Sequence, residues 1–493
     1  MRSGLLPDWT VPAGTATVFH VTPRTLDAVH AATPRPVQLS YIQKRHFLDA
    51  AGAQTVKRHS SYAVMAFEIH DAYDERLVAQ VFRDHLRRHE TYHTWVEPTG
   101  DAYAGRTVSP EDIDVEVAHV VRTRPGGTDL QKWVEVEFPD IAEWDLFRLI
   151  AIRPEGVRDR FTLAFAVDHF YIDGVSLGVI LYEFVTAYRA ARAGTAPRLL
   201  PVEGYEKYAI DEHAHTSALT LESDDVQAWL RMLVRAGGRL PAFPLPLGLS
   251  PSGRARGCGT MVEKAVDRAD LDAFGEVCRA AGASLNAGLI AIAALLDHAA
   301  TGASVYSMLT PIATRERRTQ ILSVGWYTRL VPVQVDLPDD PFDFAQLAVR
   351  AQAGVEAGAR LSRTPLHRVA ELLPAGLADS VPADFASPMI SYLDLKSLPG
   401  NDLPAKHRME VYGSVHDSRE VFTWLNRTAD GLDVNLIHPD TPLARANVGL
   451  YLRAFVAAVR TTGRLGRFDA VAMASHLLDL RTAATRENEG VTA

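Results

Sequence analysis

The stretch Ala166-Val-Asp-His-Phe-Tyr-Ile-Asp-Gly-Val-Ser176 joins an apolar run to a helical pattern over Ser176–Ala193. The apolar run predicts a strand, and the pattern after it predicts an amphipathic helix. His169 and Asp173 therefore lie four residues apart on a strand-to-helix turn, where side chains commonly reach ligands. Gly174 closes the turn, and a glycine lets a substrate pass close to the backbone. The turn is the first candidate for a reaction site, with His169 as a general base.

Strand and helix patterns alternate on both sides of this turn. Leu149–Ile152 and Arg160–Val167 predict a hairpin. Earlier, Asp74 is a suitable N-cap for a helix that continues to about Arg88. In the second half of the chain, Val421–Thr428 and Leu432–His438 predict another hairpin. This mixture of alternating elements predicts an α/β fold.

The chain has 493 residues, of which 47% are hydrophobic and 23% charged, as in ordinary globular proteins. This length predicts two or three compact units. The pattern is weak from Thr195 to about Ser223, and a predicted helix over Asp224–Ala236 and a Pro-rich stretch follow. Residues 201–248 are therefore the expected linker region between an N-terminal lobe, residues 1–200, and a C-terminal lobe, residues 249–493. The most apolar helix, Ser284–Ala300, is shorter than a bilayer requires and is expected to be a buried core helix.

Charge and cysteine content exclude several functional classes. A net charge of -9 offers no basic surface for a nucleic-acid backbone, so no nucleic-acid partner is expected. The only cysteines, Cys258 and Cys278, predict neither a disulfide framework nor a thiolate metal cluster. The amino terminus has no basic region followed by an apolar run, which predicts no signal peptide. A cytoplasmic protein without a membrane span is expected.

One short pattern resembles a zinc site. His89-Glu-Thr-Tyr-His93 has the letters HExxH, which bind zinc when both histidines lie on one face of a helix. Here the helical pattern ends near Arg88, and Thr94-Trp-Val96 predicts the start of a strand. No third ligand motif follows. We therefore expect no metal site and interpret these residues as a helix end that leads into an edge strand.

The role of Asp173 has two interpretations from the sequence alone. It could orient the imidazole of His169, or it could be a buried carboxylate paired with an arginine elsewhere. Arg315, after a predicted buried strand, is the natural partner, although the run Arg315-Glu-Arg-Arg318 by itself is more typical of a solvated turn. Likewise, Gly325-Trp-Tyr-Thr-Arg-Leu-Val-Pro-Val333 would ordinarily be core.

Five segments taken together resemble the condensation-domain superfamily, which includes chloramphenicol acetyltransferase and polyketide-associated acyltransferases. They are similar to its SxxQxR, RHExLRTxF, HHxxxDG, GxFxNTLPLR and VPFxxV elements, in that order: Ser40–Arg45, Arg88–Trp95, Asp168–Gly174, Val324–Val333 and Thr364–Val369. The third match departs from the family pattern because Asp168 replaces its first histidine. A DFGWG element is not found, which weakens a peptide-synthetase interpretation more than an acyltransferase one.

Within the superfamily, the chain most resembles the mycobacterial-type glycolipid acyltransferases of the polyketide-associated branch, on these segments: Asp8-Trp-Thr, Leu86-Arg-Arg-His-Glu-Thr-Tyr-His93, Phe243-Pro-Leu-Pro-Leu-Gly248 and Gly325-Trp-Tyr-Thr. The resemblance implies two chloramphenicol-acetyltransferase-like lobes in a pseudo-dimeric V. Each lobe is expected to be a mixed sheet covered by helices, with a tunnel between the lobes.

The resemblance also implies roles for individual residues. His169 is the expected active-site base, and Asp173, assigned to the catalytic pair, is the expected partner of Arg315. Gly174 and Arg315 are structural residues of the site, Gly174 being the glycine that a substrate approaches closely. The candidate substrate-binding residues are Asp168, Trp326, Tyr327 and Asn426. The backbone near Gly174 and the side chain of Asn426 are the candidate oxyanion donors.

The implied reaction moves an acyl group from a thioester to a hydroxyl acceptor of a secondary metabolite, polyketide or glycolipid and forms an ester. Acyl-coenzyme A or a phosphopantetheinyl carrier protein would be the co-substrate, and no bound cofactor is expected. Expected partners are the small-molecule acceptor and an acyl carrier protein or polyketide synthase, and a monomer is expected. Two alternatives stay open: amide formation with a carrier-bound amine, and a catalytically silent module that recruits a carrier protein.

Overall fold

The computed structural model describes residues 2–51, 61–99, 102–124, 126–238, 240–249, 257–340, 342–373, 387–397 and 401–485. The chain divides into two compact units. The first unit comprises Met1–Ser217, Ala313–Thr328 and Pro399–Val415. The second unit comprises Ala218–Ile312, Arg329–Leu398 and His416–Ala493.

A seven-stranded mixed sheet forms the centre of the first unit. Its order is β1 (Arg2–Leu5), β13 (Glu410–Gly413), β3 (Tyr62–Ile69), β8 (Phe161–Asp168), β7 (Phe147–Pro154), β2 (Gly14–Val21) and β6 (Val115–Thr123). Only the pairing of β1 with β13 is parallel; the others are antiparallel. The predicted hairpin of β7 and β8 is therefore confirmed.

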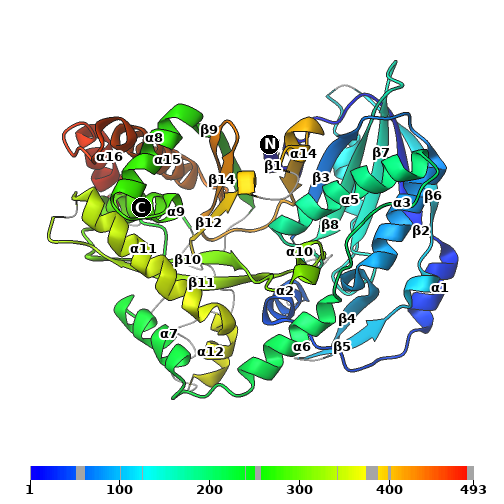
Figure 1. The fold of residues 1–493 in the computed structure, drawn as a ribbon, viewed down its shortest axis with the longest axis horizontal. Coiled ribbons are helices and arrows are strands. Elements are labelled where there is room, and N and C mark those ends of the chain that lie inside the picture. Colours follow the sequence, from blue (N-terminus) through cyan, green and yellow to red (C-terminus); the bar gives the residue numbers. More distant parts are fainter. Residues whose placement is uncertain are drawn as a thin grey trace, which may run out of the picture. The chain divides into compact units, whose positions relative to one another are not determined.

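The two faces of this sheet carry different helices because alternate residues of a strand point to opposite sides. On one face, Phe67 and Phe165 pack in a cluster with Phe82 and Phe184. These last two come from α3 (Glu75–Arg88) and α5 (Gly174–Arg192), which lie along the sheet (Figure 1). On the other face, α4 (Asp129–Glu137) packs through Val134. Every residue of β8 is buried, as expected for a strand covered on both faces.

Shorter elements complete the first unit. Its other helices are α1 (Pro23–Ala31), α2 (Tyr41–Ala51), α6 (Tyr205–Thr216), α10 (Arg318–Ile321) and α14 (Leu403–Lys406). A two-stranded sheet consists of β4 (Thr94–Thr99) and β5 (Ala102–Thr107), and 3-10 turns cover Leu6–Asp8, Glu90–His93 and Pro110–Asp112. The predicted helix after Asp74 is confirmed, with the Asp74 carboxylate accepting from the N–H groups of Arg76 and Leu77.

The second unit contains a six-stranded mixed sheet. Its order is β11 (Thr328–Asp336), β10 (Val305–Ala313), β12 (Met389–Asp394), β14 (Phe422–Thr428), β15 (Gly431–Pro439) and β9 (Cys258–Asp267). The pairings of β10 with β12 and β12 with β14 are parallel, and those of β14 with β15 and β15 with β9 are antiparallel. The second predicted hairpin is thus confirmed as β14 and β15.

One helix forms the centre of the second unit's core. The predicted apolar helix is α9 (Leu285–Thr301), in which every residue from Ala287 to Leu296 is buried. The other helices are α7 (Asp224–Arg235), α8 (Arg268–Ala280), α11 (Phe344–Arg360), α12 (Leu366–Leu372), α15 (Pro442–Leu465) and α16 (Ala474–Thr485), with 3-10 turns at Leu361–Arg363 and Leu395–Ser397. In the described residues, no single helix has the length and apolar composition to cross a membrane; α8 and α9 would meet that test only as a pair, bent by 92°.

The sequence-based boundaries differ from this division in two respects. The predicted linker, residues 201–248, is divided between the two units after Ser217 and contains, besides the expected helix α7, the helix α6. In addition, residues 313–328 and 399–415 belong to the first unit, although both fall inside the predicted C-terminal lobe. The second of these segments supplies β13, which is inserted between β1 and β3. Strand pairing between residues so far apart leaves no local sequence signal, so contiguous boundaries missed it.

Candidate active site

The HxxxDG segment forms the turn between the end of β8 and the start of α5. The N–H of Ile172 donates to the carbonyl of His169 at 3.3 Å, which closes the turn. Asp173 is the N-cap of α5, because its carboxylate accepts from the backbone N–H and the hydroxyl of Ser176, both at 2.8 Å. Such a cap satisfies N–H groups that have no helical partner. The helix consequently begins two residues earlier than the predicted Ser176.

Asp173 also forms a buried ion pair with Arg315. Two guanidinium nitrogens of Arg315 donate to the two carboxylate oxygens, at 2.5 and 2.9 Å. Both side chains are almost completely buried. Burial by itself would raise the pKa of Asp173, but the charge and hydrogen bonds of Arg315 and Ser176 lower it below its usual value. Of the two interpretations of Asp173, the arginine pair is the one present in the structure.

Arg315 is fixed by more than this carboxylate. It also donates to the carbonyls of Gln320 and Ser323, at 3.2 and 3.3 Å, and its guanidinium lies over the ring of Tyr327 at 4.6 Å. The guanidinium donors are therefore used by backbone and side-chain acceptors at once, which suits the planar fork of arginine. The segment that carries Arg315 is in this way attached to the start of α5.

His169 lies at the centre of the turn, partly buried, with its ring against Trp326. The ring centroids are 4.3 Å apart and the planes are tilted by 34°. Its Nδ1 atom is buried and has no hydrogen-bond partner among the described residues. Burial lowers the pKa of His169, the nearby His46 lowers it further, and Asp168 and Asp173 act in the opposite direction. A neutral imidazole is the form that can accept a proton.

Asp168 and His46 form a second pair beside His169. Nε2 of His46, on α2, lies 2.8 Å from Oδ1 of Asp168, and the same oxygen accepts from the N–H of Phe170 at 2.7 Å. The rings of His46 and Trp326 form an edge-to-face contact at a centroid distance of 5.2 Å. Asp168 was predicted as a substrate-binding residue, but nothing in its position along the chain indicated this histidine partner.

The SxxQxR-like segment holds α2 against the turn. The side-chain amide of Gln43 donates to the carbonyl of Phe170 at 2.9 Å, and its oxygen accepts from the backbone N–H of Ser40 at 3.3 Å. The hydroxyl of Tyr205, on α6, donates to the carbonyl of Trp326 at 2.8 Å and lies 3.0 Å from the hydroxyl of Ser40, within hydrogen-bond distance. Three segments that are distant in the sequence are thereby linked around the turn.

The two histidines of the HExxH pattern do not share a site, because each has a different hydrogen-bond partner. Nε2 of His89 lies 2.8 Å from a carboxylate oxygen of Glu183 on α5, whereas Nε2 of His93 donates to the carbonyl of Leu86 at 2.9 Å. His85 lies 3.0 Å from the same oxygen of Glu183, and Arg88 donates to its other oxygen at 2.9 Å. His85, His89 and Glu183 are close enough to hold an ion, but Arg88 already supplies a positive charge to the carboxylate.

The other predicted site residues have different environments. A Cβ placed on Gly174 would meet no atom within 4 Å, so open space lies beside this glycine. Tyr327 is completely buried, where its hydroxyl donates to Ser323 at 3.1 Å. This burial argues against the predicted contact with substrate and assigns the ring to support of Arg315. Asn426 lies on β14 of the second unit and is nearly buried.

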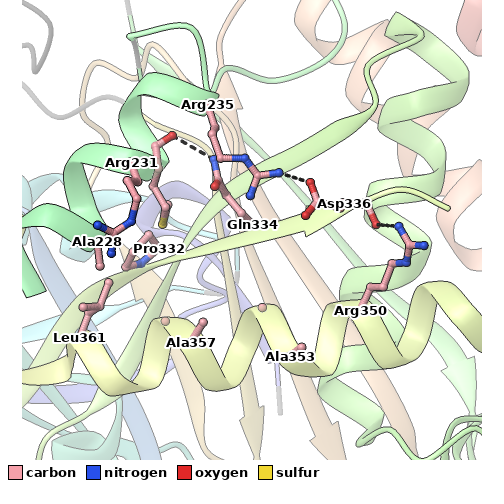
Figure 2. Close-up of a pocket in the computed structure, with 13 residues that line it drawn as sticks. Ala228, Arg231, Arg235, Pro332, Gln334, Asp336, Arg350, Ala353, Ala357 and Leu361 are labelled. Atoms are coloured by element: carbon pink, nitrogen blue, oxygen red, sulfur yellow. Dashed lines mark hydrogen bonds and ion pairs between the residues drawn. The ribbon is translucent and has the colours of Figure 1, made fainter. Parts of the chain in front are cut away.

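A groove of about 540 Å³ in the second unit lacks the groups that acyl transfer requires. It lies between α7 and α11 over β11, and Arg231, Arg235 and Arg350 supply its positive charge (Figure 2). Asp336 pairs with Arg235, and its carbonyl accepts from Arg350 at 3.3 Å. The described residues that line the groove include no histidine, serine or cysteine. The turn around His169 is therefore the better candidate for the reaction.

Comparison with known proteins identifies the family of the chain. The family model of the condensation domain matches residues 35–381, a range that contains His46, His169, Arg315 and Trp326. The chain belongs to the condensation-domain family. Condensation-domain proteins of known structure share the fold: the first condensation domain of the CDA synthetase aligns over 86% of this chain and 96% of its own, with a TM-score of 0.63 and 16% identity.

More similar relatives of this condensation-family chain are acyltransferases. Acyltransferase PapA3 of Mycobacterium tuberculosis is 29% identical over 476 residues, which cover 95% of this chain and 98% of the relative. PapA1 of Mycobacterium bovis, a 2'-acyl-2-O-sulfo-trehalose (hydroxy)phthioceranyltransferase, is 31% identical over 454 residues, 91% and 86% of the two chains. The structure of a PapA2 acyl transferase aligns over 94% of this chain and 99% of its own, with a TM-score of 0.84 and 26% identity. The chain is an acyltransferase, and its two mixed sheets with covering helices are those of this family.

Proposed function

We propose that this acyltransferase moves an acyl group from a thioester to a hydroxyl of a glycolipid or related secondary metabolite, with His169 as general base. The observation that supports it most is the environment of His169: an imidazole at the strand-to-helix turn, with a lowered pKa and open space at the neighbouring Gly174. The acceptor class is supported by two relatives that act on trehalose derivatives, PapA1 and the trehalose-2-sulfate acyltransferase PapA2.

In the proposed reaction, the imidazole of His169 takes the proton of the acceptor hydroxyl as its oxygen attacks the thioester carbonyl. The tetrahedral intermediate then collapses, the carbon–sulfur bond breaks, and the imidazolium returns the proton to the departing sulfur. The products are an ester and a free thiol. The donor would be acyl-coenzyme A or the pantetheine of a carrier protein, and a synthase or carrier protein would be the protein partner in the second case. No covalent acyl-enzyme is required, because the acceptor itself is the nucleophile.

The test uses palmitoyl-coenzyme A as donor and trehalose or trehalose-2-sulfate as acceptor. Thiol release follows the reaction, and mass spectrometry identifies the acylated sugar. His169→Ala should lower kcat/KM by roughly 10²–10⁴, the usual contribution of a positioned base. His298→Gln is the matched control, since His298 lies in the second unit and contacts only the carbonyl of Ala303 among its described hydrogen bonds.

The same assay separates the alternatives. If His169→Ala turns over as fast as the wild type, the assignment of His169 as general base is wrong. Faster acylation of an amine analogue of the sugar than of the sugar itself would favour amide formation. If no donor, with either class of acceptor, releases thiol above the uncatalysed rate, the proposed transfer is wrong and a recruiting role is favoured.

A further inference from the structure

Within the described residues, no hydrogen bond at Nδ1 fixes the ring of His169, although this atom is buried. The carboxylate of Asp173 is already used by Arg315 and by the start of α5. The closest described ring contact of His169 is with the indole of Trp326, at a centroid distance of 4.3 Å, against 6.5 Å for His46. The orientation of His169 therefore depends on where this indole is held.

The segment that carries the indole is attached to the first unit at three consecutive residues. The N–H of Val324 donates to Nδ1 of His89 at 3.3 Å. The N–H of Gly325 donates to the hydroxyl of Ser176 at 3.3 Å, and the same hydroxyl donates to the carbonyl of Gly325 at 3.0 Å. The carbonyl of the tryptophan accepts from Tyr205 at 2.8 Å. Of these attachments, the first depends on a histidine.

His89 connects Val324 to the helix that begins at the reaction turn. Its Nε2 lies 2.8 Å from Oε2 of Glu183 on α5. Ser176 and Glu183 are about two helical turns apart on α5, so they lie on one face of it. Ser176 contacts the segment directly, at Gly325, whereas Glu183 reaches the segment through the imidazole of His89. One helix face thus holds two neighbouring residues of the segment.

The partners of His89 determine which of its nitrogens carries the proton. The carboxylate of Glu183 also accepts from Arg88, and an ionised carboxylate only accepts, so Nε2 is the donor. Nδ1 faces the N–H of Val324, which can only donate, so Nδ1 is the unprotonated acceptor. The side chain is completely buried, and this neutral form satisfies both of its nitrogens. Since Nε2 carries the proton, it has no lone pair for a metal ion shared with His85 and Glu183.

We propose that His89 is a positioning residue of the acyl-transfer site, whose neutral imidazole supports Trp326 and so keeps the ring of His169 in place. This inference rests on the proposed role of His169 as the base. Without the acceptor at Nδ1, the N–H of the buried Val324 would be unpaired, which favours a shift of the segment. A displacement of about 1 Å near reacting groups can lower the rate by about 10²-fold.

Two amide substitutions at position 89 separate its two hydrogen bonds. His89→Asn keeps an acceptor for Val324, because Oδ1 of asparagine and Nδ1 of histidine are both bonded to Cγ, but it loses the contact with Glu183. His89→Gln keeps a donor for Glu183, one bond further out, and leaves Val324 without its acceptor. The full chain is labelled with fluorinated tryptophan. Fluorine NMR then follows the resonance of Trp326, which is assigned by its loss in Trp326→Phe.

The proposal predicts which of the two variants is impaired. His89→Gln should shift the Trp326 resonance and lower kcat by about 10- to 100-fold, with a smaller change in KM. His89→Asn should keep the resonance and kcat close to those of the wild type. A merely structural role would give the opposite ranking, because His89→Asn loses the charge-assisted hydrogen bond to Glu183.

The matched control is His93→Gln. His93 is a buried histidine of the same short segment, but its Nε2 donates to the carbonyl of Leu86 at 2.9 Å. Glutamine can keep that donor. This variant should change neither the Trp326 resonance nor kcat.

A wild-type Trp326 resonance in folded His89→Gln would overturn the inference, and so would a shifted resonance in folded His89→Asn. If His89→Gln does not fold, His89→Asn still decides the matter through the second of these outcomes. The fluorine readout needs neither substrate nor turnover, so it is separate from the role of His169. Activity retained by His169→Ala would reject that role and leave the measured support of Trp326 standing.

Discussion

The guanidinium of Arg315 donates two hydrogen bonds to the carboxylate of Asp173, although the residues are 142 positions apart in the sequence. The pair joins the start of α5 to the segment that carries Trp326. Because Asp173 also caps α5, one carboxylate fixes both the helix and the turn that holds His169. Asp173 and Arg315 are therefore expected to support the stability of the fold and the position of His169.

Removing one partner of this pair should destabilise the protein strongly. Asp173→Ala leaves a buried guanidinium without its counterion, and a loss of about 3–5 kcal/mol in the free energy of unfolding is expected. Urea unfolding measures it. The control is Arg464→Ala, which breaks a bidentate pair with Asp270 in which the arginine is 65% exposed. That change should cost about 1 kcal/mol or less. Equal losses for the two variants would contradict the structural role.

The acidic limb of the pH–activity profile should lie below pH 6.5, the ordinary pKa of histidine. Burial and His46 lower the pKa of His169, so the imidazole stays unprotonated, and able to act as a base, to a lower pH than a free histidine. The profile of kcat/KM between pH 5 and 8 reports this group in the free enzyme. A midpoint above that of free histidine would contradict the assignment.

A side chain at position 174 should leave the stability of the fold unchanged but should lower activity. A Cβ there meets open space, so Gly174→Val should leave the melting temperature nearly unchanged. If the substrate passes this glycine, kcat/KM should fall by about tenfold or more, which corresponds to roughly 1.4 kcal/mol of transition-state stabilisation. Gly275→Val on α8 is the matched control, because its Cβ also meets no atom within 4 Å. Full activity of Gly174→Val would show that no substrate approaches there.

Acid should destabilise the protein below pH 6.5 through the network around Glu183. Burial lowers the pKa of His89 to about 4. In the unfolded chain this histidine takes up a proton near pH 6.5, whereas in the folded chain it stays neutral, so stability falls as the pH decreases through this window. The contribution of His89 is up to about 3 kcal/mol. Urea unfolding at pH 7 and pH 5 should show a smaller difference for His89→Gln than for the wild type, and an equal difference would contradict it.

Local signals in the sequence predicted much of the framework. The N-cap Asp74, the hairpin of β7 and β8 and the buried helix α9 follow from capping chemistry, alternation and apolar runs, all of which act over a few residues. The motif order predicted the family and the proximity of His169, Asp173, Arg315 and Trp326. By contrast, Tyr327 was expected at the substrate, whereas the structure buries it. The sequence could not indicate this, because an aromatic residue in a turn looks the same in the sequence whichever way its ring points.

The sequence by itself determined the strand, turn and helix around His169, since their periodicity and the capping carboxylate are local properties. Only the tertiary structure decided what surrounds that histidine. The insertion of β13, the return of residues 313–328 to the first unit and the contact of His46 with Asp168 all join residues far apart in the chain. Such contacts depend on the packing of whole elements, and packing sets the charge and burial on which the chemistry of His169 depends.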